Sequence, residues 1–335
     1  MSGGVDSAVT AALLQDAGHE VIGVTMKLWG GPSDTGCCAV SDVLDARRAA
    51  DKLGIDYHVF NFGDDFERFV VEPYVEAHAA GLTPNPCIEC NRSIKFDRFL
   101  ERAEVLGFDA VATGHHARLV EHADGYRYIA RGADPKKDQS YVLHTLGQSE
   151  LARLMFPIGD LTKDAVRAIA TDRGLRVASK PDSQDVCFIT RDGGRNDFLG
   201  ERMTFTPGTI QTADGEGVGS VDAVELITIG QRKGLGIGGG GEPKYVVDVD
   251  VSEATVTIGS KADLLTAHLD VDAIAWTGPV LSGEFDVQTS AHGKPASAHL
   301  SGNRLTWTSP HRRIAAGQSI VLYRGDRVVG GGLAV

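Results

Sequence analysis

In the first half of the chain, hydrophobic positions alternate between helical spacing and short continuous runs. Residues 7–17 carry apolar side chains at helical spacing and stop at Gly18, a residue that favours helix ends. A β-prone run over 21–28 follows, and then a second helical pattern over 41–53 that ends at Gly54. This alternation of helix and strand predicts an α/β domain built on a parallel sheet.

The same alternation continues for another hundred residues with one interruption. We expect strands and helices at 57–62 (strand), 64–80 (helix), 91–106 (helix), 109–113 (strand), 126–131 (hairpin arm) and 161–174 (helix capped by Thr162). Between these elements, residues 81–90 carry Pro84 and Pro86, which indicate a stiff loop. The α/β pattern therefore extends to about residue 195.

Beyond Asn196 the helical periodicity fades and short β-like runs appear between glycines. Residues 229–241 form a basic, glycine-rich stretch. From about residue 267 the predicted strands recur at roughly ten-residue spacing with turn signals between them, which is typical of a small β-barrel. The pattern thus predicts an α/β part followed by two β-rich parts.

Composition narrows the class of protein without changing this picture. A chain of 335 residues is long enough for two or three domains. We find no apolar run of membrane-spanning length and no secretory signal, and we therefore expect a cytoplasmic protein without membrane contact. The net charge of −12 argues against non-specific coating of nucleic acid but allows a local basic patch.

The first residues carry the strongest chemical signal. Gly3 and Gly4 have no Cβ, so their backbone amides can approach a ligand closely, and a helix begins directly after them. Residues 2–7, with the sequence SGGVDS, therefore suit a phosphate or pyrophosphate, although a tight turn with a good helix cap is the alternative. A Walker A loop is excluded because no Gly-Lys-Ser/Thr follows.

A loop of this kind normally follows a strand, and here one residue precedes it. We therefore expect the first strand to be missing and the chain to start at an internal Met. Mass spectrometry of the native N-terminus tests this expectation. Met26 lies at the end of the run over 21–28, where it would pack on an adenine ring or simply belong to the core.

The cysteines are the second chemical signal. Their odd number in a large chain favours reactive or metal-binding thiols over a disulfide scaffold. Cys90 is expected near the start of the helix over 91–106, where the helix dipole favours a thiolate. Cys87 and Cys90 would also serve as half of a zinc site, but a second pair is missing. Cys187 lies in an apolar run and is equally consistent with a buried, inert thiol.

Taken in order, these landmarks resemble the tRNA-specific 2-thiouridylases along the whole chain. The matching motifs are residues 2–7, 36–42, 83–96, 112–115, 137–140, 182–189, 229–236 and 317–319. The resemblance implies three parts. An adenine nucleotide α-hydrolase-like (PP-loop) domain over 1–195 would be followed by a small central β domain over 196–263 and a C-terminal β-barrel over 264–335. The second and third parts would help to hold tRNA.

The resemblance also implies an activity and its residues. The reaction would be ATP-dependent 2-thiolation of the wobble uridine in tRNAs for Lys, Glu and Gln, with Cys90 as nucleophile and Cys187 as the carrier of a persulfide. A Cys90–Cys187 disulfide would be left for reduction. Residues implied at ATP are Met1, Ser2, Gly3, Gly4, Val5, Asp6, Ser7, Met26 and Gly114. Residues implied at the tRNA are Asn85, Pro86 and Cys87 around the target base, and His115, Lys137, Asp138, Gln139 and Gln318 elsewhere.

The implied chemistry suits these residue types. Adenylation turns the uracil oxygen into a good leaving group, and pyrophosphate would depart into the loop amides while Mg²⁺ offsets its charge. The expected partners are tRNA, whose base must be splayed out of its loop, and a persulfide donor such as a cysteine desulfurase or a sulfur relay protein.

The chain departs from the family pattern at several positions. Cys87 stands where many members carry an aspartate, so that Cys87, Cys90 and Cys187 offer a set of ligands for an iron–sulfur cluster. Residues 224–227 replace an aromatic segment, and residues 298–299 (Ala-His) lie roughly where an Arg-Tyr pair is usual. Cys37 and Cys38 match a family pair for which packing is the expected role.

Two other functions are therefore kept beside the first. One is a different PP-loop adenylating ligase, such as an amidotransferase synthetase, which would use ammonia and would not need Cys90 and Cys187. The other is a tRNA-binding iron–sulfur protein without turnover, which leaves the loop at 2–7 unexplained.

Overall fold

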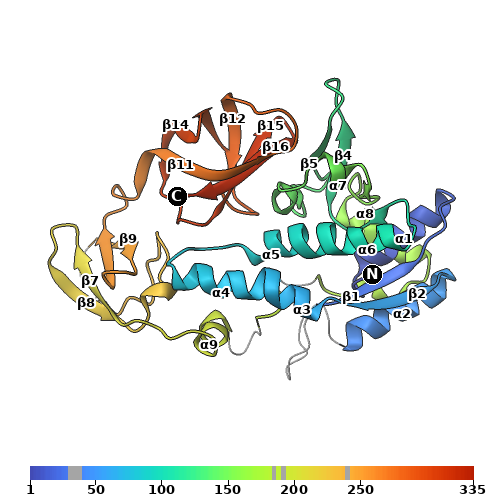
Figure 1. Cartoon of the computed structure of the whole chain (residues 1–335), viewed down its shortest axis with the longest axis horizontal. Coiled ribbons are helices and arrows are strands. Elements are labelled where there is room, and N and C mark those ends of the chain that lie inside the picture. The colour runs from blue at the N-terminus through green and yellow to red at the C-terminus, as the bar shows by residue number, and fades with distance from the viewer. Residues whose placement is uncertain (29–39, 183–185, 190–193, 238–241) are drawn as a thin grey trace.

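The computed structural model describes residues 1–28, 40–182, 186–189, 194–237 and 242–335 (Figure 1). The chain forms an α/β part, a small β part and a barrel, which lie at the right, the left and the top of Figure 1. Cys37 and Cys38 and residues 238–241 of the glycine-rich stretch lie outside the described residues, as do residues 183–185 of the motif around Cys187. No helix among the described residues is both long and apolar enough to cross a membrane.

The α/β part follows the predicted alternation. Its elements are α1 (Val5–Asp16), β1 (Gly23–Lys27), α2 (Val40–Leu53), β2 (Tyr57–Asn61), α3 (Gly63–Phe66), η1 (Glu67–Val71), α4 (Glu72–Ala79), α5 (Pro86–Glu89), η2 (Cys90–Arg98), α6 (Phe99–Val105), β3 (Val111–Ala112), β4 (Ala117–Glu121), β5 (Arg127–Arg131), η3 (Ser140–Leu143), α7 (Gln148–Leu151), β6 (Leu154–Met155), α8 (Lys163–Asp172), η4 (Arg176–Ser179) and α9 (Gly194–Gly200).

Both strand pairs at the centre of this part are parallel, as predicted. β1 pairs with β2, and β3 pairs with β6. The two pairs are separate sheets, and no other described strand pairs with any of these four. Gly18 and Gly54 end their elements with φ of +85° and +68°, a left-handed backbone that glycine adopts without strain.

The proline-rich segment differs from the prediction. A helix begins at Pro86 within the expected loop, because proline suits the first helical position and the Asn85 side chain accepts a hydrogen bond from the Cys87 amide at 3.0 Å. Cys87 therefore lies in the first turn of this helix. Cys90 lies one turn later, at the start of the π-helical stretch η2. The expectation that Cys90 sits near the helix start is thus wrong.

The small β part is a four-stranded sheet of order β8-β7-β10-β9. Its elements are β7 (Gly208–Thr212), β8 (Gly217–Val221), η5 (Val224–Leu226), β9 (Tyr245–Asp250) and β10 (Thr255–Gly259). Ile210, Val246 and Val256 are fully buried between this sheet and η5 and form the centre of its own core. The sheet therefore has a core separate from that of the α/β part.

Six antiparallel strands close the C-terminal barrel, which confirms the predicted architecture. They are β11 (Leu265–Trp276), β12 (Gly283–Gln288), β13 (Ala296–Ser301), β14 (Arg304–Arg312), β15 (Ser319–Arg324) and β16 (Arg327–Ala334). Their order is β11-β14-β13-β12-β15-β16, and β11 pairs with β16 to complete the circle. Closure pairs the edge strands with each other and surrounds a core that includes Leu300, Leu305 and Ile320.

A hairpin from the α/β part joins the two larger parts. β4 and β5 extend the barrel sheet at β16, where Ala130 pairs with Arg327. The guanidinium of Arg131 donates to Asp138 and to Gln288, each at 2.9 Å, and lies 3.9 Å from the centre of the Tyr323 ring. Arg131, at the end of β5, therefore connects the α/β part to the barrel within the sheet to which both parts contribute strands.

Candidate functional site

A cavity of about 1520 Å³ opens in the α/β part beside the N-terminus of α1. Most residues that the sequence pointed to line it: Met1, Ser2, Gly4, Val5, Asp6, Ser7, Met26, Pro86, Cys87, Cys90, Gly114, His115, Lys137, Asp138, Gln139 and Cys187. Gly3, Asn85 and Gln318 do not. The fold thus gathers segments from the first 190 residues around one space.

The loop over residues 2–7 is a compact turn held by two serines. Ser7 Oγ donates to the carbonyl oxygen of Gly4 and accepts from the amide of Ser2, both at 3.1 Å. Among the described residues no side chain caps the first turn of α1, which suits the binding of an external anion to its amides.

Two glycines let this loop pack closely. Gly3 has φ of +71°, and a Cβ there would collide with the backbone of Asp42. At Gly114 a Cβ would lie 2.8 Å from the backbone of Asp6 and Ser7. Both positions therefore require glycine if the loop is to keep its shape, and the contact of Gly114 with ATP that the resemblance implies stays a prediction.

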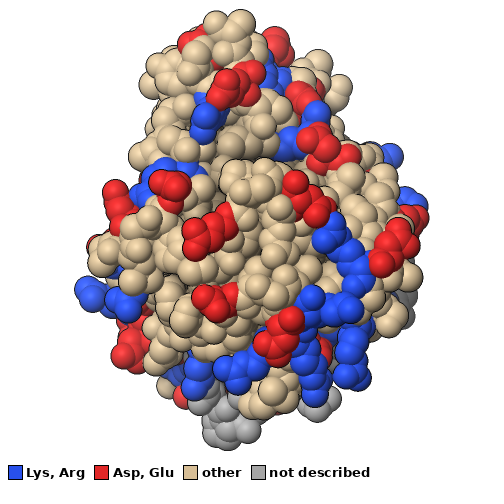
Figure 2. Space-filling view, turned by 90° about the vertical axis from the view of Figure 1, so that its right-hand side faces the viewer, with Lys and Arg blue, Asp and Glu red and all other residues tan. Residues whose placement is uncertain are grey.

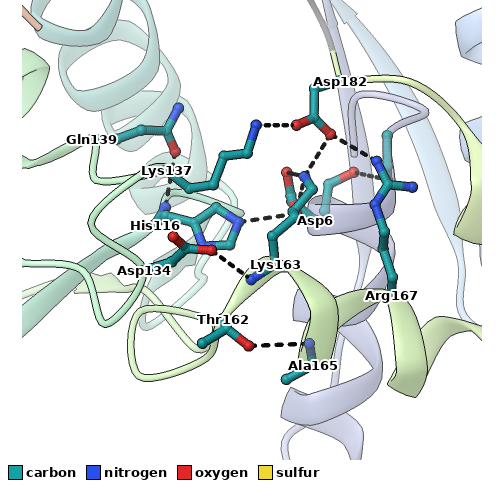
Figure 3. Close-up of polar contacts among 12 residues, drawn as sticks. Asp6, His116, Asp134, Lys137, Gln139, Thr162, Lys163, Ala165, Arg167 and Asp182 are labelled. Carbon is teal, nitrogen blue, oxygen red and sulfur yellow. Dashed lines mark hydrogen bonds and ion pairs between the residues drawn. The ribbon is translucent and has the colours of Figure 1, made fainter. Parts of the chain in front are cut away.

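A chain of ion pairs lies beside the loop (Figure 3). Lys163 Nζ contacts both carboxylate oxygens of Asp6, at 2.8 and 2.7 Å, and Oδ1 of Asp182 at 2.8 Å. His116 Nε2 lies 3.2 Å from Asp6 Oδ1. Burial acts to raise the pKa of Asp6, but the hydrogen bonds with His116 and Lys163 outweigh it and lower that pKa. Asp6 is therefore a carboxylate at neutral pH.

Asp182 is the second centre of this chain. Besides Lys163, its carboxylate contacts Lys137 at 2.7 Å and Arg167 at 3.0 Å. Burial opposes ionisation, yet the hydrogen bonds from Lys137 and Lys163 bring the pKa of Asp182 down to about 2. On the other side of the loop, Lys180 contacts Asp42, Asp45 and the carbonyl oxygen of Gly3, at 2.6, 2.7 and 3.0 Å.

The sequence analysis missed Lys163, Arg167 and Lys180. Lys163 alone left a clue, because it occupies the first position of α8, directly after the cap residue Thr162. A cation is disfavoured at a helix N-terminus, so a buried lysine there indicates a specific anionic partner.

The three described cysteines line the same cavity and carry thiols that are not joined in a disulfide. Cys90 is buried in an apolar cluster with Phe188, and Cys187 packs at the edge of that cluster. Among the residues that the structure describes, no group of three or more His, Cys, Asp or Glu side chains is placed to hold a metal ion. The arrangement therefore presents separate thiols.

Several residues expected at the tRNA are engaged within the protein. His115 is buried and its Nδ1 lies 2.7 Å from Thr113 Oγ1, and burial holds its pKa well below 6.5. Asp138 accepts from Arg131, from the Gly132 amide and from Ser140.

The other predicted tRNA residues differ in how exposed they are. Gln139 Oε1 accepts from the His116 amide at 2.9 Å, and Gln318 lies in the turn before β15. Gln139 is nevertheless exposed, and Lys137, which pairs with Asp182, leaves 41% of its side chain exposed. The proposed roles of these residues stay predictions.

The barrel also contributes to the cavity. Ala291 and His292, in the loop between β12 and β13, are part of its lining. Residues 298–299, where the sequence analysis placed the altered Arg-Tyr pair, lie on β13. His299 Nδ1 is 3.0 Å from Oε1 of Glu284 on the neighbouring strand β12. Sequence spacing did not reveal His292, because it reaches the cavity only when the barrel docks on the α/β part.

Charge on the outside is unevenly distributed. Figure 2 shows Lys and Arg side chains gathered in the lower part of the face seen at the right of Figure 1. A local basic patch therefore exists on a chain with a net charge of −12.

Comparisons with known proteins agree with this architecture. Three family models match consecutive segments: the tRNA methyl transferase HUP domain at residues 1–191, the tRNA methyl transferase PRC-barrel domain at 196–260 and the aminomethyltransferase beta-barrel domain at 266–334.

Curated relatives match over nearly the whole chain. A protein of Chloroflexus aurantiacus named tRNA-specific 2-thiouridylase MnmA is 46% identical over 345 residues, which cover 99% of this chain and 96% of the relative. Relatives of the same name from Corynebacterium efficiens (45% over 353 residues, 99% and 96% covered) and Corynebacterium jeikeium (44% over 369 residues, 99% and 92% covered) agree. The resemblance inferred from the motifs is confirmed, and the chain belongs to the family of the tRNA-specific 2-thiouridylases.

Proposed function

We propose that this chain is an ATP-dependent tRNA-uridine 2-sulfurtransferase. One observation carries the proposal. The glycine loop at residues 2–7, which leads into a helix without a side-chain cap, lines the same cavity as two thiols, Cys90 and Cys187. The loop suits the phosphates of ATP, and the thiols suit the transfer of sulfur. The names of two matching family models refer to methyl transfer, but neither feature is needed to move a methyl group.

In the first step, the O2 oxygen of uridine attacks the α-phosphorus of ATP and pyrophosphate leaves. The amides at the start of α1 and the nearby lysines would hold the departing phosphates. Mg²⁺ would arrive with the phosphates of ATP, since such ions are commonly held by substrate phosphates with only one or two protein carboxylates. Asp6 is the carboxylate within the loop, and both its oxygens now accept from Lys163.

In the second step, sulfur replaces the activated oxygen. Cys187 would carry the persulfide, and the Cys90 thiolate would attack the Cys187 Sγ, which breaks the sulfur–sulfur bond and frees the outer sulfur as a nucleophile at C2. AMP leaves, 2-thiouridine forms, and the Cys90–Cys187 disulfide that results must be reduced by two electrons before the next turnover. Both residues line the cavity, and both belong to the apolar cluster around Phe188.

The remaining roles follow from the family. We propose that the wobble uridine of tRNAs for Lys, Glu and Gln is the target, that a cysteine desulfurase or sulfur relay protein supplies the persulfide, and that the reaction takes place in the cytoplasm. The residues proposed at the base are Asn85, Pro86 and Cys87, and the basic patch in Figure 2 offers a surface for the phosphate backbone.

One assay separates this function from the two alternatives. The protein is incubated with ATP, Mg²⁺, a persulfide source and tRNA, and the nucleosides are analysed. We expect 2-thiouridine with wild-type protein and none with Cys187→Ser. Pyrophosphate release without a thiolated product would contradict the proposal and favour another adenylating ligase.

Cys87→Ser is the matched control because it removes a thiol from the same cavity. A persulfide mechanism predicts that this variant still forms 2-thiouridine, with a loss of at most about tenfold from the altered contact with the base, because the thiol at 87 transfers no sulfur. A cluster held by all three cysteines predicts instead that Cys87→Ser is as inactive as Cys187→Ser. Iron and sulfide analysis after anaerobic purification gives an independent reading of the same question.

A further inference from the structure

Phe188, the residue directly after Cys187, is buried among aromatic rings. It is 4% exposed. The rings of Phe66 on α3, Tyr74 on α4 and Phe198 on α9 have their centroids 5.6, 5.5 and 5.0 Å from the centroid of its ring. Phe66 and Tyr74 meet it at 73° and 85°, which is the edge-to-face arrangement that aromatic pairs favour. These three rings form a socket that holds Phe188.

The backbone around Cys187 forms a strained turn over residues 186–189. Val186 has φ of +53°, a left-handed conformation that β-branched residues rarely adopt. The amide of Ile189 donates to the Val186 carbonyl oxygen at 3.3 Å and closes the turn. Strain of this kind persists only where the surroundings hold the segment in place, and the buried ring of Phe188 supplies such a hold. Cys187 therefore lies inside a turn that is anchored at the next residue.

Cys187 differs from Phe188 in what it faces. Cys187 is only partly buried and lines the cavity. Cys90 lines the same cavity and is buried in the apolar cluster that contains Phe188. Sulfur transfer between two such residues depends on their relative position, since a misplacement of about 1 Å can lower a rate by about a hundredfold. The anchor beside Cys187 is thus placed to influence the reaction.

We propose that Phe188 is a positioning residue that holds Cys187 in place for sulfur transfer. The socket holds the ring of Phe188, the ring holds the turn, and the turn sets where the Cys187 Sγ lies in the cavity. The inference rests on the proposed function, since it adds a residue to the sulfur-transfer step. Adenylation takes place at the glycine loop and should not depend on Phe188.

The first experiment compares the two steps in one reaction. Phe188→Leu, in excess over tRNA, is mixed with ATP, Mg²⁺ and a persulfide source, and the rates of pyrophosphate and 2-thiouridine formation are measured together. Leucine keeps an apolar side chain in the socket but lacks the ring contacts. We expect 2-thiouridine formation to slow by roughly tenfold or more, while pyrophosphate formation keeps its rate. A mere loss of folded protein would lower both rates together.

Two further variants test the socket itself. Phe198→Leu removes one of its rings and leaves residue 188 unchanged, so it should slow 2-thiouridine formation relative to pyrophosphate formation in the same way. Phe205→Leu is the matched control, because Phe205 packs at the edge of the same cluster without being one of the three socket rings. The control should keep the two rates in proportion.

A second measurement needs neither ATP nor tRNA. Alkylation of Cys187 by iodoacetamide is followed by mass spectrometry, and Cys87, which lines the same cavity, serves as the internal standard. In Phe188→Leu the turn is held less firmly and opens more often, so alkylation at Cys187 relative to Cys87 should become severalfold faster. Phe205→Leu should leave this relative rate unchanged.

Two results would overturn the inference: sulfur transfer by Phe188→Leu that stays in proportion to adenylation, or a relative alkylation rate at Cys187 that Phe188→Leu leaves as in wild type. Failure of the proposed function looks different. In that case the wild-type protein makes no 2-thiouridine from tRNA, and the alkylation rates alone decide whether Phe188 holds Cys187.

Discussion

The α/β part and the barrel differ in strand pairing and in the kind of side chain that each one buries. The α/β part holds two short parallel strand pairs around a cavity of about 1520 Å³, with Lys163, His115 and His116 buried near the cavity. The barrel pairs every strand with two neighbours and fills its interior with apolar side chains. A closed sheet satisfies its own backbone, whereas the cavity gathers cations such as Lys163 and Lys137, which carboxylates hold there.

The joint between the two parts is built from buried polar groups. Arg131, Asp138 and Tyr323 meet there, and His144 packs so closely on Gly331 of β16 that a Cβ at that glycine would overlap its ring. The barrel is therefore more than an appendage that follows the α/β part in the chain. It completes the cavity with His292 and shares a sheet with the hairpin β4–β5.

The largest expected effect is on 2-thiouridine formation in a Cys90 variant that keeps its fold. Cys90→Ser should lower 2-thiouridine formation by on the order of a thousandfold or more, because a hydroxyl cannot replace the attacking thiolate. Pyrophosphate release and the melting temperature should change little, since adenylation precedes sulfur transfer and the barrel is untouched. Nucleoside analysis, a pyrophosphate assay and thermal melting give the three readings. Retained thiolation would remove Cys90 from the mechanism.

The second prediction breaks the joint. Arg131→Met should cost about 3 kcal/mol of unfolding free energy, because it leaves the buried carboxylate of Asp138 without its cation. Urea unfolding measures the loss. Arg327→Met removes only a cation lying 5.2 Å from the Tyr128 ring and should cost less than about 1 kcal/mol. Equal losses for the two variants would show that the joint depends on the ring contacts.

The third prediction concerns pH at the same joint. Burial lowers the pKa of His144 from its usual 6.5 to about 4, so the folded protein keeps the ring neutral while the unfolded chain takes up a proton. Stability should therefore be complete above pH 6.5 and fall as the pH drops toward 4, by about 2 kcal/mol between pH 7 and pH 5. Urea unfolding across this range measures the slope.

His144→Asn is the control for the pH effect. Its amide can donate to the Tyr141 carbonyl oxygen as the ring Nδ1 does at 3.0 Å, but it does not titrate. The part of the slope due to His144 should disappear in this variant. His115, whose pKa burial also lowers, should keep a residual slope of the same sign.

The smallest expected effect tests the glycine loop. Ser7→Ala removes the hydroxyl that ties Gly4 to Ser2 and should weaken ATP binding by about tenfold, which corresponds to roughly one hydrogen bond. Unfolding free energy should change by less than about 0.5 kcal/mol, because the loop is near the surface. Ser149→Ala on α7 is a control in which neither quantity should move. Calorimetric titration with ATP gives the affinity.

Local signals in the sequence were sufficient for much of the fold. Gly18 and Gly54 ended their helices as expected, and Thr162 caps α8 by accepting from the Ala165 amide at 3.3 Å. The segment at Pro86 was misjudged, because proline at the first position of a helix and proline in a loop look alike without the cap at Asn85.

The candidate site was predictable only where a motif named its residues. The glycine loop and the three cysteines were found in this way, and all of them face the cavity except Gly3, whose backbone packs against Asp42. Lys163 and His292 were not found. The position of Lys163 directly after Thr162 was the one local sign, but its partner Asp6 lies 157 positions away, and the loop with His292 reaches the cavity only by docking of the barrel.

By itself the sequence determined the order of elements, the family and the chemical types of the reacting groups, because turns, caps and helical spacing act between near neighbours in the chain. Only the tertiary structure decided which charges meet. It placed Asp6 and Asp182 on one lysine, closed the barrel through β11 and β16, and turned the side chain of Asp138 inward to Arg131. Such contacts depend on burial and on distance in space, and neither quantity is written in the spacing of residues along the chain.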